Sequence, residues 1–396
     1  MKKQLLSLFA VVFASAAIQA QCTNLYIDEA FASFDSVSVV YSSTNQVMTI
    51  YTPTGDVSTK RPLLIMAHGG SFVGGNRYEV TSSTICQNFA KRGYVTASIS
   101  YRLASSPFDM INTNTAYPVV VKAISDAKAA VRYFSKDAAT TNTYKVDTNN
   151  MFFGGNSAGA IIAIQYAYID DTTELAADLR SVMNANGGIE GNSGNSGYSS
   201  KIKAILNLAG GILDTAWIAN ATEQPAANFH GDADGTVPFN CGRVLNGASQ
   251  IALCGTGTMT PRFANLGINH VTKVYPGDGH VPWEGSAAKF NEVDSMSAEF
   301  LSRRICGNVG IQTIDKSSLL NVSPNPASDR LTVEFNGTSS IIEIVFTDAV
   351  GRQIISNTPT SNVVNISTQN IPNGLYFVEV RMKDNFRAVQ RVQIMK

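Results

Sequence analysis

A single serine stands between two glycines in the segment 155–159, Gly-Asn-Ser-Ala-Gly, at the junction of two apolar runs. A serine hydroxyl is a weak nucleophile until a base removes its proton, so Ser157 predicts nucleophilic catalysis only together with a histidine and an acid. The preceding Met-Phe-Phe predicts a buried strand and the following Ala-Ile-Ile-Ala-Ile-Gln a helix, which favours a catalytic turn with Ser157 at its apex. The structural alternative is a tight turn that merely contains a serine.

Asp234 and His280 are the acid and the base that we expect to complete this site. They follow Ser157 in the order nucleophile, acid, base, within the segments FHGDADGTVPF and YPGDGHVPW. Asp234 would hold one ring nitrogen of His280 while the other ring nitrogen faces Ser157. The residues that remain as alternatives are Asp214 as the acid, Asp232 and Asp278 as turn residues or secondary contacts, and His230 and His270 as structural or surface histidines.

A second motif, His68-Gly69-Gly70-Ser71-Phe72, follows the apolar run PLLIMA. The backbone N–H groups of Gly70 and Ser71, with that of Ala158, are predicted to stabilise an oxyanion, and His68 is expected to fix the loop rather than to act as a base. Aromatic residues near the predicted strand ends are candidates for the substrate pocket, although such residues are equally often packing residues. They are Phe72, Trp217 and Trp283.

The elements that must position these residues form an alternating pattern. Apolar runs such as RPLLIMA, NMFFGG, IKAILNL and AANFHG are separated by helical patterns such as VVVKAISDAKAAVRYFSKDA, which predicts an α/β fold with a mainly parallel sheet flanked by helices. Ligands bind at the carboxyl ends of the strands in such sheets, where the candidate residues stand. Residues 37–51 predict an antiparallel strand pair, and residues 186–200 predict a surface loop, part of a lid or a solvated insertion.

The chain of 396 residues divides into four predicted parts. Residues 1–20 have a basic start and a short apolar stretch, which predicts a cleaved secretory signal peptide; an uncleaved anchor is the alternative. Residues 21–308 form the catalytic domain, residues 309–318 a linker, and residues 319–396 a small all-β sandwich with alternating strands and turns.

Composition excludes some partners. The 30 basic and 30 acidic residues cancel, so we expect no nucleic-acid partner and no anionic membrane surface. The scattered histidines and the cysteine spacing argue against a metal, and no cofactor is implied. Of five cysteines in an exported protein, Cys241 and Cys254 are the pair that we expect to form a disulfide, whereas the pairing of Cys22, Cys86 and Cys306 stays open.

The segments HGGSF, GNSAG, HGDADGTVP and GDGH together resemble the α/β-hydrolase superfamily, in particular esterases with an HGGG-type oxyanion loop, over residues 25–305. The resemblance implies a carboxylesterase-like or lipase-like enzyme without a cofactor. Ser71 stands where the third glycine of that loop would be, and Asn156 stands where related carboxylesterases often have glutamate.

The segments SPNPASDRLTVEF, TDAVGRQI and NGLYFVEV with the terminal lysine resemble the C-terminal sorting domain of type IX (Por) secretion in Bacteroidota, over residues 319–396. This resemblance implies a secreted or cell-surface protein whose partner is the outer-membrane type IX machinery.

The expected function is therefore a secreted serine hydrolase whose substrate is a carboxylic ester of a small molecule, a polysaccharide, a lipid or a polyester. The alternatives are a serine peptidase of the same fold, a non-catalytic binding protein, and a polysaccharide-binding or adhesive protein that acts through the β domain.

Overall fold

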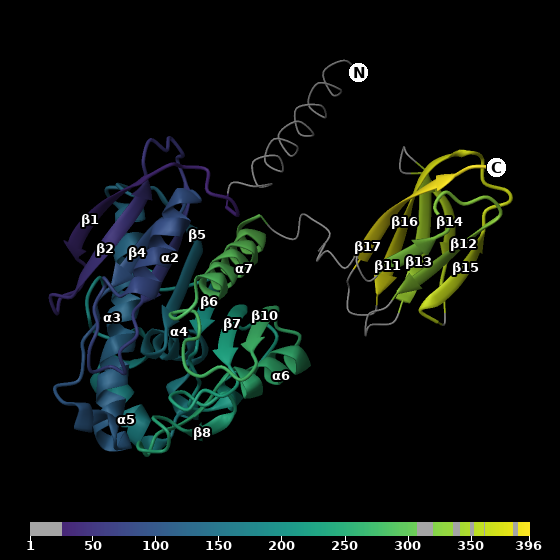
Figure 1. Ribbon diagram of the computed structural model, residues 1–396. Helices are drawn as coiled ribbons and strands as arrows, with labels where there is room; N and C mark the ends of the chain where they lie inside the picture. Colours follow the sequence, from purple (N-terminus) through teal and green to yellow (C-terminus); the bar gives the residue numbers. More distant parts are fainter. Residues whose placement is uncertain (1–25, 307–319, 336–340, 349–351, 360, 383–386) are drawn as a thin grey trace. The chain divides into compact units, whose positions relative to one another are not determined.

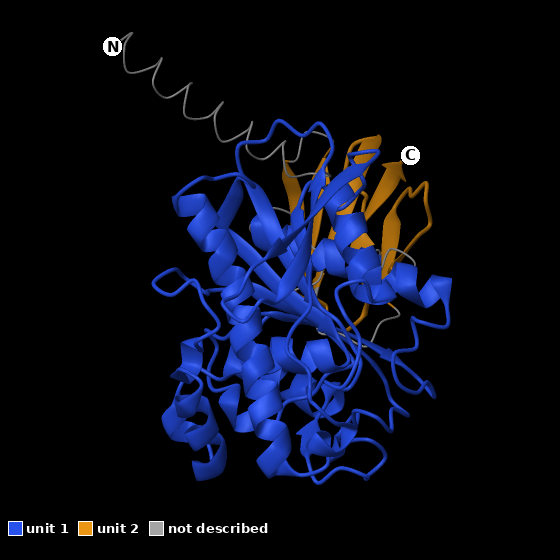
Figure 2. Cartoon of the chain, turned by 90° about the vertical axis from the view of Figure 1, so that its left-hand side faces the viewer, with its two compact units in different colours: residues 1–307 blue, residues 308–396 orange. Residues whose placement is uncertain are grey.

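The computed structural model describes residues 26–306, 320–335, 341–348, 352–359, 361–382 and 387–396. The chain divides into two compact units, residues 1–307 and 308–396, which are coloured separately in Figure 2. The predicted signal peptide and linker lie outside the described residues. Within the described parts, no helix is both long enough and apolar enough to cross a membrane.

An eight-stranded sheet forms the centre of the first unit, in the order β1-β2-β4-β3-β5-β6-β7-β10 (Figure 1). Strands β1 and β2 pair with each other, and β2 with β4, in antiparallel fashion, whereas all the other neighbours are parallel. The predicted strand pair and the mainly parallel sheet are both confirmed. The bounds are β1 Phe34–Val40, β2 Val47–Pro53, β3 Arg61–Ala67, β4 Val95–Ile99, β5 Val146–Asn156, β6 Ala204–Leu208, β7 Ala226–Gly231 and β10 His270–Tyr275.

Helices cover both faces of this sheet because the central strands are apolar on both faces. On β3, Leu63 and Ile65 belong to one buried cluster and Leu64 and Met66 to another, as the alternation of side chains along a strand requires. The first cluster contains side chains of α3 and α4, and the second contains side chains of α2 and α7, so each pair of helices packs on one face of the sheet. The helix bounds are α2 Val80–Lys91, α3 Thr113–Ala139, α4 Ala158–Tyr168, α5 Ala177–Ala185, α6 Thr256–Leu266 and α7 Ala287–Ile305.

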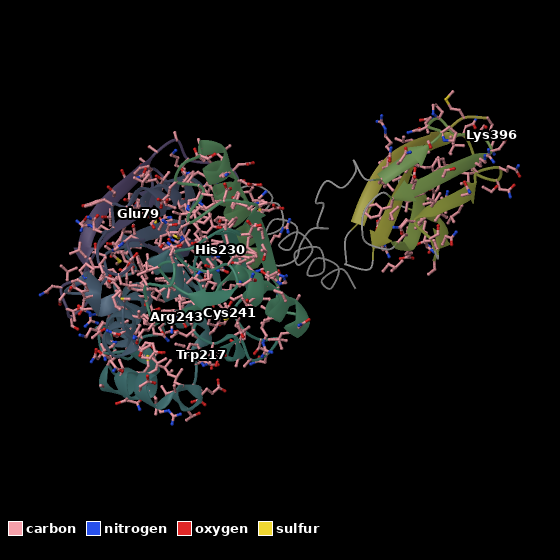
Figure 3. The ribbon with its side chains drawn as sticks, turned by 60° about the horizontal axis from the view of Figure 1, so that its bottom comes forward. Glu79, Trp217, His230, Cys241, Arg243 and Lys396 are labelled. Carbon is pink, nitrogen blue, oxygen red and sulfur yellow. A yellow bond between two sulfur atoms is a disulfide. The ribbon has the colours of Figure 1, made fainter. Side chains whose placement is uncertain are left out.

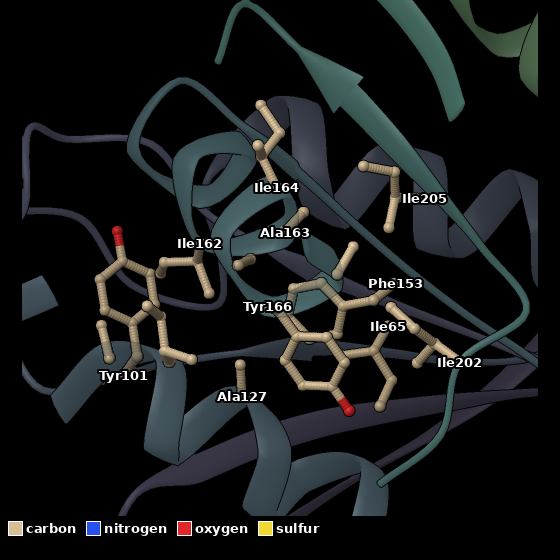
Figure 4. Close-up of a cluster of buried hydrophobic side chains, with 14 of the residues drawn as sticks. Ile65, Tyr101, Ala127, Phe153, Ile162, Ala163, Ile164, Tyr166, Ile202 and Ile205 are labelled. Atoms are coloured by element: carbon tan, nitrogen blue, oxygen red, sulfur yellow. The ribbon is translucent and has the colours of Figure 1, made fainter. Parts of the chain in front are cut away.

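The packing between β5 and α4 fixes the position of the turn that joins them. Phe153 of β5 and Tyr166 of α4 stack with ring centroids 5.3 Å apart, among the side chains drawn in Figure 4. The Tyr166 hydroxyl donates a hydrogen bond to the carbonyl of Ser200. A strand and a helix that are buried against each other leave the turn between them little freedom to move.

Short elements complete the first unit. The hairpin of β8 (Cys241–Arg243) and β9 (Ala252–Cys254) is closed by the Cys241–Cys254 disulfide, as predicted, and Cys86 is a free, buried thiol. The 3-10 turns of the first unit are η1 Pro107–Met110, η2 Thr172–Glu174, η3 Gly188–Glu190 and η4 Thr215–Trp217.

The loop at residues 186–200 is anchored to the body of the unit. Ser193 is fully buried, with its hydroxyl 2.7 Å from that of Ser125 on α3. The amide of Asn195 donates to the backbone carbonyl of Tyr41. The loop is therefore not the freely solvated insertion that its composition suggests.

The second unit consists of two antiparallel sheets, in the orders β11-β12-β15 and β14-β13-β16-β17. Both sheets contribute to one hydrophobic core, as Leu331 and Val333 of β12 and Ile344 and Phe346 of β13 show. The predicted β domain is thus confirmed. Its strands are β11 Leu320–Ser323, β12 Arg330–Phe335, β13 Ile341–Asp348, β14 Gln353–Asn357, β15 Val363–Ser367, β16 Gly374–Met382 and β17 Arg387–Ile394.

Candidate active site

Ser157 lies on a sharp turn between β5 and α4, with φ 53° and ψ −114°. This is an unfavourable backbone conformation for a residue with a side chain, and such strain concentrates at functional sites. The turn requires glycine on both sides: a Cβ at Gly155 would lie 2.1 Å from the carbonyl carbon of Gly159, and one at Gly159 would lie 2.0 Å from the carbonyl oxygen of Ala67. The Ser157 amide donates to the carbonyl of Leu208, which ties the turn to β6.

Three side chains from three loops meet at this turn. The hydroxyl oxygen of Ser157 lies 2.7 Å from Nε2 of His280, and Nδ1 of the same ring lies 2.6 Å from Oδ2 of Asp234. Asp234 follows β7 and His280 follows β10, which are parallel neighbours in the sheet, so their carboxyl ends lie side by side. The structure therefore brings together the three residues that the sequence suggests as nucleophile, base and acid.

The Asp234 carboxylate is buried and saturated with hydrogen bonds. Its Oδ1 accepts from the amides of Thr236 and Val237, at 2.8 and 2.9 Å. Burial raises the pKa of Asp234. This effect is outweighed by hydrogen bonds from His230, His280 and the Val237 amide and by the charge of His280, which together hold the pKa of Asp234 well below its usual range. The residue is thus a carboxylate at neutral pH, able to orient His280 and to balance its charge.

The loop after β3 lies beside the turn, since a Cβ at Gly69 would lie 3.4 Å from the Cβ of Ser157. Gly70, Ser71 and Phe72 have consecutive positive φ angles of 115°, 54° and 63°, and the carbonyl of Gly70 accepts from the amide of Gly74. Within the described residues, the amides of Gly70 and Ser71 donate no hydrogen bond, and neither does that of Ala158 at the start of α4. These are the three N–H groups that the sequence suggests for an oxyanion site.

His68 supports this loop and does not contact Ser157. Its ring stacks on Tyr101, with centroids 4.3 Å apart, and Nδ1 donates to the carbonyl of Gly69 at 2.6 Å. The Tyr101 hydroxyl in turn donates to the His68 carbonyl. Burial lowers the pKa of His68, and the ring that stacks on Tyr101 is therefore favoured in its neutral form.

An apolar cavity opens beside Ser157 and extends along α4. Ala158, Ile161 and Gln165 line it from one face of that helix, a span of about 10 Å at 1.5 Å per residue. Ser71 and Phe72 lie on the wall that the oxyanion loop supplies. The other lining residues are Met110, Tyr117, Val120, Val121, Ile124, Ile169, Leu179, Leu213, Thr236, Val237, Val244, Leu245, Ile251 and Leu253.

Two of the three aromatic residues predicted to line the substrate pocket do not line this cavity, whereas Phe72 does. Trp217, labelled in Figure 3, is buried at the end of η4, which packs against α6. Trp283 is buried on the other face of the sheet, where its indole N–H donates to Oδ1 of Asn156 at 3.1 Å. Neither side chain lines the cavity beside Ser157, although Trp283 lines a second pocket together with Glu79 and Glu284.

The alternative acids and bases are accounted for elsewhere. Asp214 caps η4 through the amide of Ala216, Asp232 accepts from the amide of Gly277, and Asp278 pairs with Lys289. His270 contacts the carbonyl of Ile268 at the start of β10. His230 differs from these because its Nε2 lies 3.1 Å from Oδ2 of Asp234, a contact that sequence order did not indicate.

Among the described residues, no three His, Cys, Asp or Glu side chains gather in a way that could hold a metal ion. The arrangement that the structure does contain is a hydroxyl, an imidazole and a carboxylate in hydrogen-bonded series, beside unpaired amides and an apolar cavity.

Comparison with known proteins agrees with this architecture. Residues 48–228 match the model of the BD-FAE family, an α/β-hydrolase esterase family, and residues 321–395 match the secretion system C-terminal sorting domain. The second match indicates secretion through the type IX system to the cell surface or the extracellular space. No curated protein matches the chain.

Solved structures share the fold of the first unit. The propionate-bound esterase 2 of Thermogutta terrifontis, a Planctomycetes species, is 20% identical with a TM-score of 0.50, over 67% of this chain and 93% of that one. The same enzyme phosphoramylated by tabun gives the same values. A truncated carbohydrate esterase from gut microbiota is 19% identical with a TM-score of 0.50, over 70% of this chain and 98% of that one. The chain is therefore similar to the BD-FAE family over residues 48–228 and to the C-terminal sorting domain of the Por secretion system over residues 321–395.

Proposed function

We propose that this protein is a secreted serine hydrolase that cleaves carboxylic esters through an acyl-enzyme on Ser157. The observation that carries the proposal is the continuous contact from Ser157 Oγ to His280 Nε2 and from His280 Nδ1 to Asp234, at 2.7 and 2.6 Å. A serine in this setting can lose its proton to the ring at the moment of attack, because the carboxylate stabilises the imidazolium that forms.

In the first half of the reaction, the Ser157 oxygen attacks the ester carbonyl and its proton passes to Nε2 of His280. The carbonyl oxygen becomes an oxyanion that accepts hydrogen bonds from the amides of Gly70, Ser71 and Ala158. His280 then gives the proton to the alcohol oxygen as the carbon–oxygen bond breaks. In the second half, water attacks the acyl-enzyme by the same route and frees the acid.

The cavity along α4 is the proposed site of the acyl group. Its lining is almost wholly hydrocarbon, so an uncharged apolar acyl chain gains free energy on entering, whereas a charged one would lose its hydration. The esterases that share this fold include esterase 2 of Thermogutta terrifontis, solved both with propionate bound and phosphoramylated by tabun, and a carbohydrate esterase from gut microbiota. They support ester chemistry, with acyl groups of this kind as the first substrates to test.

The test is hydrolysis of p-nitrophenyl acetate, butyrate and octanoate by the full chain and by Ser157→Ala. We expect the variant to lose a factor of about 10³ or more in kcat, the loss typical of an absent nucleophile. Ser295→Ala, at an exposed position on α7, is the matched control and should retain full activity.

Two further assays distinguish the alternatives. A fluorophosphonate probe should label the wild-type chain and not Ser157→Ala, whereas a non-catalytic binding protein would not be labelled at all. Peptide anilides should be turned over far more slowly than esters. Turnover of anilides in place of esters would mean that the protein is a serine peptidase instead.

A further inference from the structure

His230 contacts Asp234, the acid of the proposed triad. It belongs to β7, is fully buried and is labelled in Figure 3. Its Nε2 lies 3.1 Å from Oδ2 of Asp234 and 3.0 Å from the carbonyl oxygen of Val237, and its Nδ1 lies 3.1 Å from the hydroxyl of Thr256. Both ring nitrogens therefore have partners, although the ring itself is out of reach of solvent.

The partners determine where the proton of this ring resides. Nε2 faces two oxygens that can only accept, so it must carry the proton and share it between Asp234 and the Val237 carbonyl. Nδ1 can then accept a hydrogen bond from the hydroxyl of Thr256, which is itself fully buried. The Thr256 hydroxyl and the Val237 carbonyl thus hold His230 in the tautomer that donates to the acid.

This contact completes the set of donors around Asp234. Its Oδ1 accepts from two amides, and its Oδ2 accepts from His280 at 2.6 Å and from His230 at 3.1 Å. Four donors on four lone-pair sites leave the carboxylate no freedom to rotate about its own bond without breaking a hydrogen bond. The orientation of Asp234, and through it the tilt of the His280 ring, depends on all four.

We propose that His230 is a positioning residue for hydrolysis, acting through Asp234 and never touching the substrate. The proposal rests on the proposed function, since it assigns to His230 the task of holding the acid in that mechanism. The competing explanation is that His230 only fills space between β7 and α6.

Two substitutions separate these explanations. His230→Gln keeps a side-chain N–H at similar reach, whereas His230→Phe keeps a ring of similar size but no donor. A lone buried acceptor costs about 1–3 kcal/mol, so we expect His230→Phe to lower kcat by roughly 5-fold to 150-fold with KM nearly unchanged. His230→Gln should recover most of this loss. A space-filling role predicts the reverse order, with the ring-preserving variant nearer to wild type.

A double-mutant cycle shows whether His230 acts through the acid. In the Asp234→Ala background, His230→Phe should leave kcat unchanged, because the group that it positions is absent. An equal loss of kcat in both backgrounds would overturn the proposal. If His230→Phe does not fold, Thr256→Val takes its place, because it removes the donor to Nδ1 and should lower kcat in the same direction while leaving the ring in position.

The experiment uses the full chain, with active sites counted by fluorophosphonate titration so that only folded enzyme is compared. Full activity of Ser157→Ala would overturn the proposed function itself. An inactive Ser157→Ala together with a His230→Phe variant of unchanged kcat would overturn the role of His230 alone.

Discussion

Asn156, directly before the nucleophile, accepts a hydrogen bond at its Oδ1 from the indole N–H of Trp283, three residues after His280. The other side of the same amide donates from Nδ2 to Glu284 at 2.7 Å. One side chain at the turn thus holds two successive residues of the loop that carries the base. The amide is nearly fully buried, so these bonds are shielded from water.

Replacing Trp283 with Phe should therefore lower the rate of catalysis, although Trp283 does not line the cavity beside Ser157. The change keeps an aromatic ring but leaves Oδ1 of Asn156 without its donor, at a cost of about 1–3 kcal/mol in stability. The loop then holds His280 less firmly against Ser157, and we expect kcat to fall roughly tenfold, which corresponds to 1.4 kcal/mol. Steady-state kinetics and thermal unfolding measure the two effects.

Trp217→Phe is the matched control, because Trp217 is also buried but lies outside the loop that carries the base. It should lower stability and leave kcat unchanged. Equal kcat values for the two variants would show that the Asn156–Trp283 bond has no part in positioning His280.

The elements around Ser157 were predictable because their signals are local. A buried strand, a turn with two closely spaced glycines and an apolar helix follow one another within about twenty residues, and each has a recognisable pattern of residue types. The identity of Asp234 and His280 rested on chain order and on their position after strands. That logic works because the ends of parallel strands meet at one edge of the sheet.

Features made by distant parts of the chain were not predictable in the same way. The cavity wall combines apolar residues from α3, α4, α5 and the β8–β9 hairpin, and these residues do not differ in type from core residues. Trp283 follows the base closely in sequence, yet nothing in the sequence showed that it points to the far face of the sheet. The Gly, Asn and Ser of residues 186–200 suggested solvent exposure, but Ser193 is buried against Ser125.

The cavity along α4 should determine acyl preference. Ile161 lines it one turn beyond Ser157. Ile161→Phe adds bulk at that point, and we expect kcat/KM for p-nitrophenyl octanoate to fall about 10-fold to 100-fold, since overpacking costs 1–3 kcal/mol. The acetate ester, which does not reach that depth, should react at nearly the wild-type rate.

Ile161→Val is the control that removes bulk instead of adding it. Its kcat/KM for p-nitrophenyl octanoate should be at least as high as that of wild type. A uniform loss on all esters in Ile161→Phe would indicate a disturbed turn rather than a blocked acyl site.

The disulfide in the β8–β9 hairpin should stabilise the same cavity, because Val244 and Ile251 within its loop line the wall. A bridge across 13 residues contributes about 3 kcal/mol by restricting the unfolded chain. Replacing Cys241 and Cys254 together with Ser should lower the melting temperature and raise KM more for octanoate than for acetate. Unchanged KM ratios would show that the wall keeps its shape without the bridge.

The sorting domain should be dispensable for catalysis and necessary for export. Residues 308–396 form a compact unit of their own, and the cavity and triad lie within the first unit. Deleting them in a bacterium with type IX secretion should leave kcat unchanged and move the activity from the medium to the cells. A deletion variant that still reaches the medium would mean that the domain is not the export signal of this chain.

The depressed pKa of Asp234 makes a prediction about acid stability. An acid whose pKa is lower in the folded than in the unfolded chain stabilises the fold fully above the unfolded pKa, about 3.9 for Asp, and loses that contribution as the pH falls toward the folded value. The melting temperature of wild type should therefore fall more steeply below about pH 4 than that of Asp234→Asn, whose side chain does not titrate. Asp214→Asn, which changes an exposed acid outside the triad, should follow the wild-type curve. Parallel curves for wild type and Asp234→Asn would show that the hydrogen bonds to Asp234 persist when it is protonated.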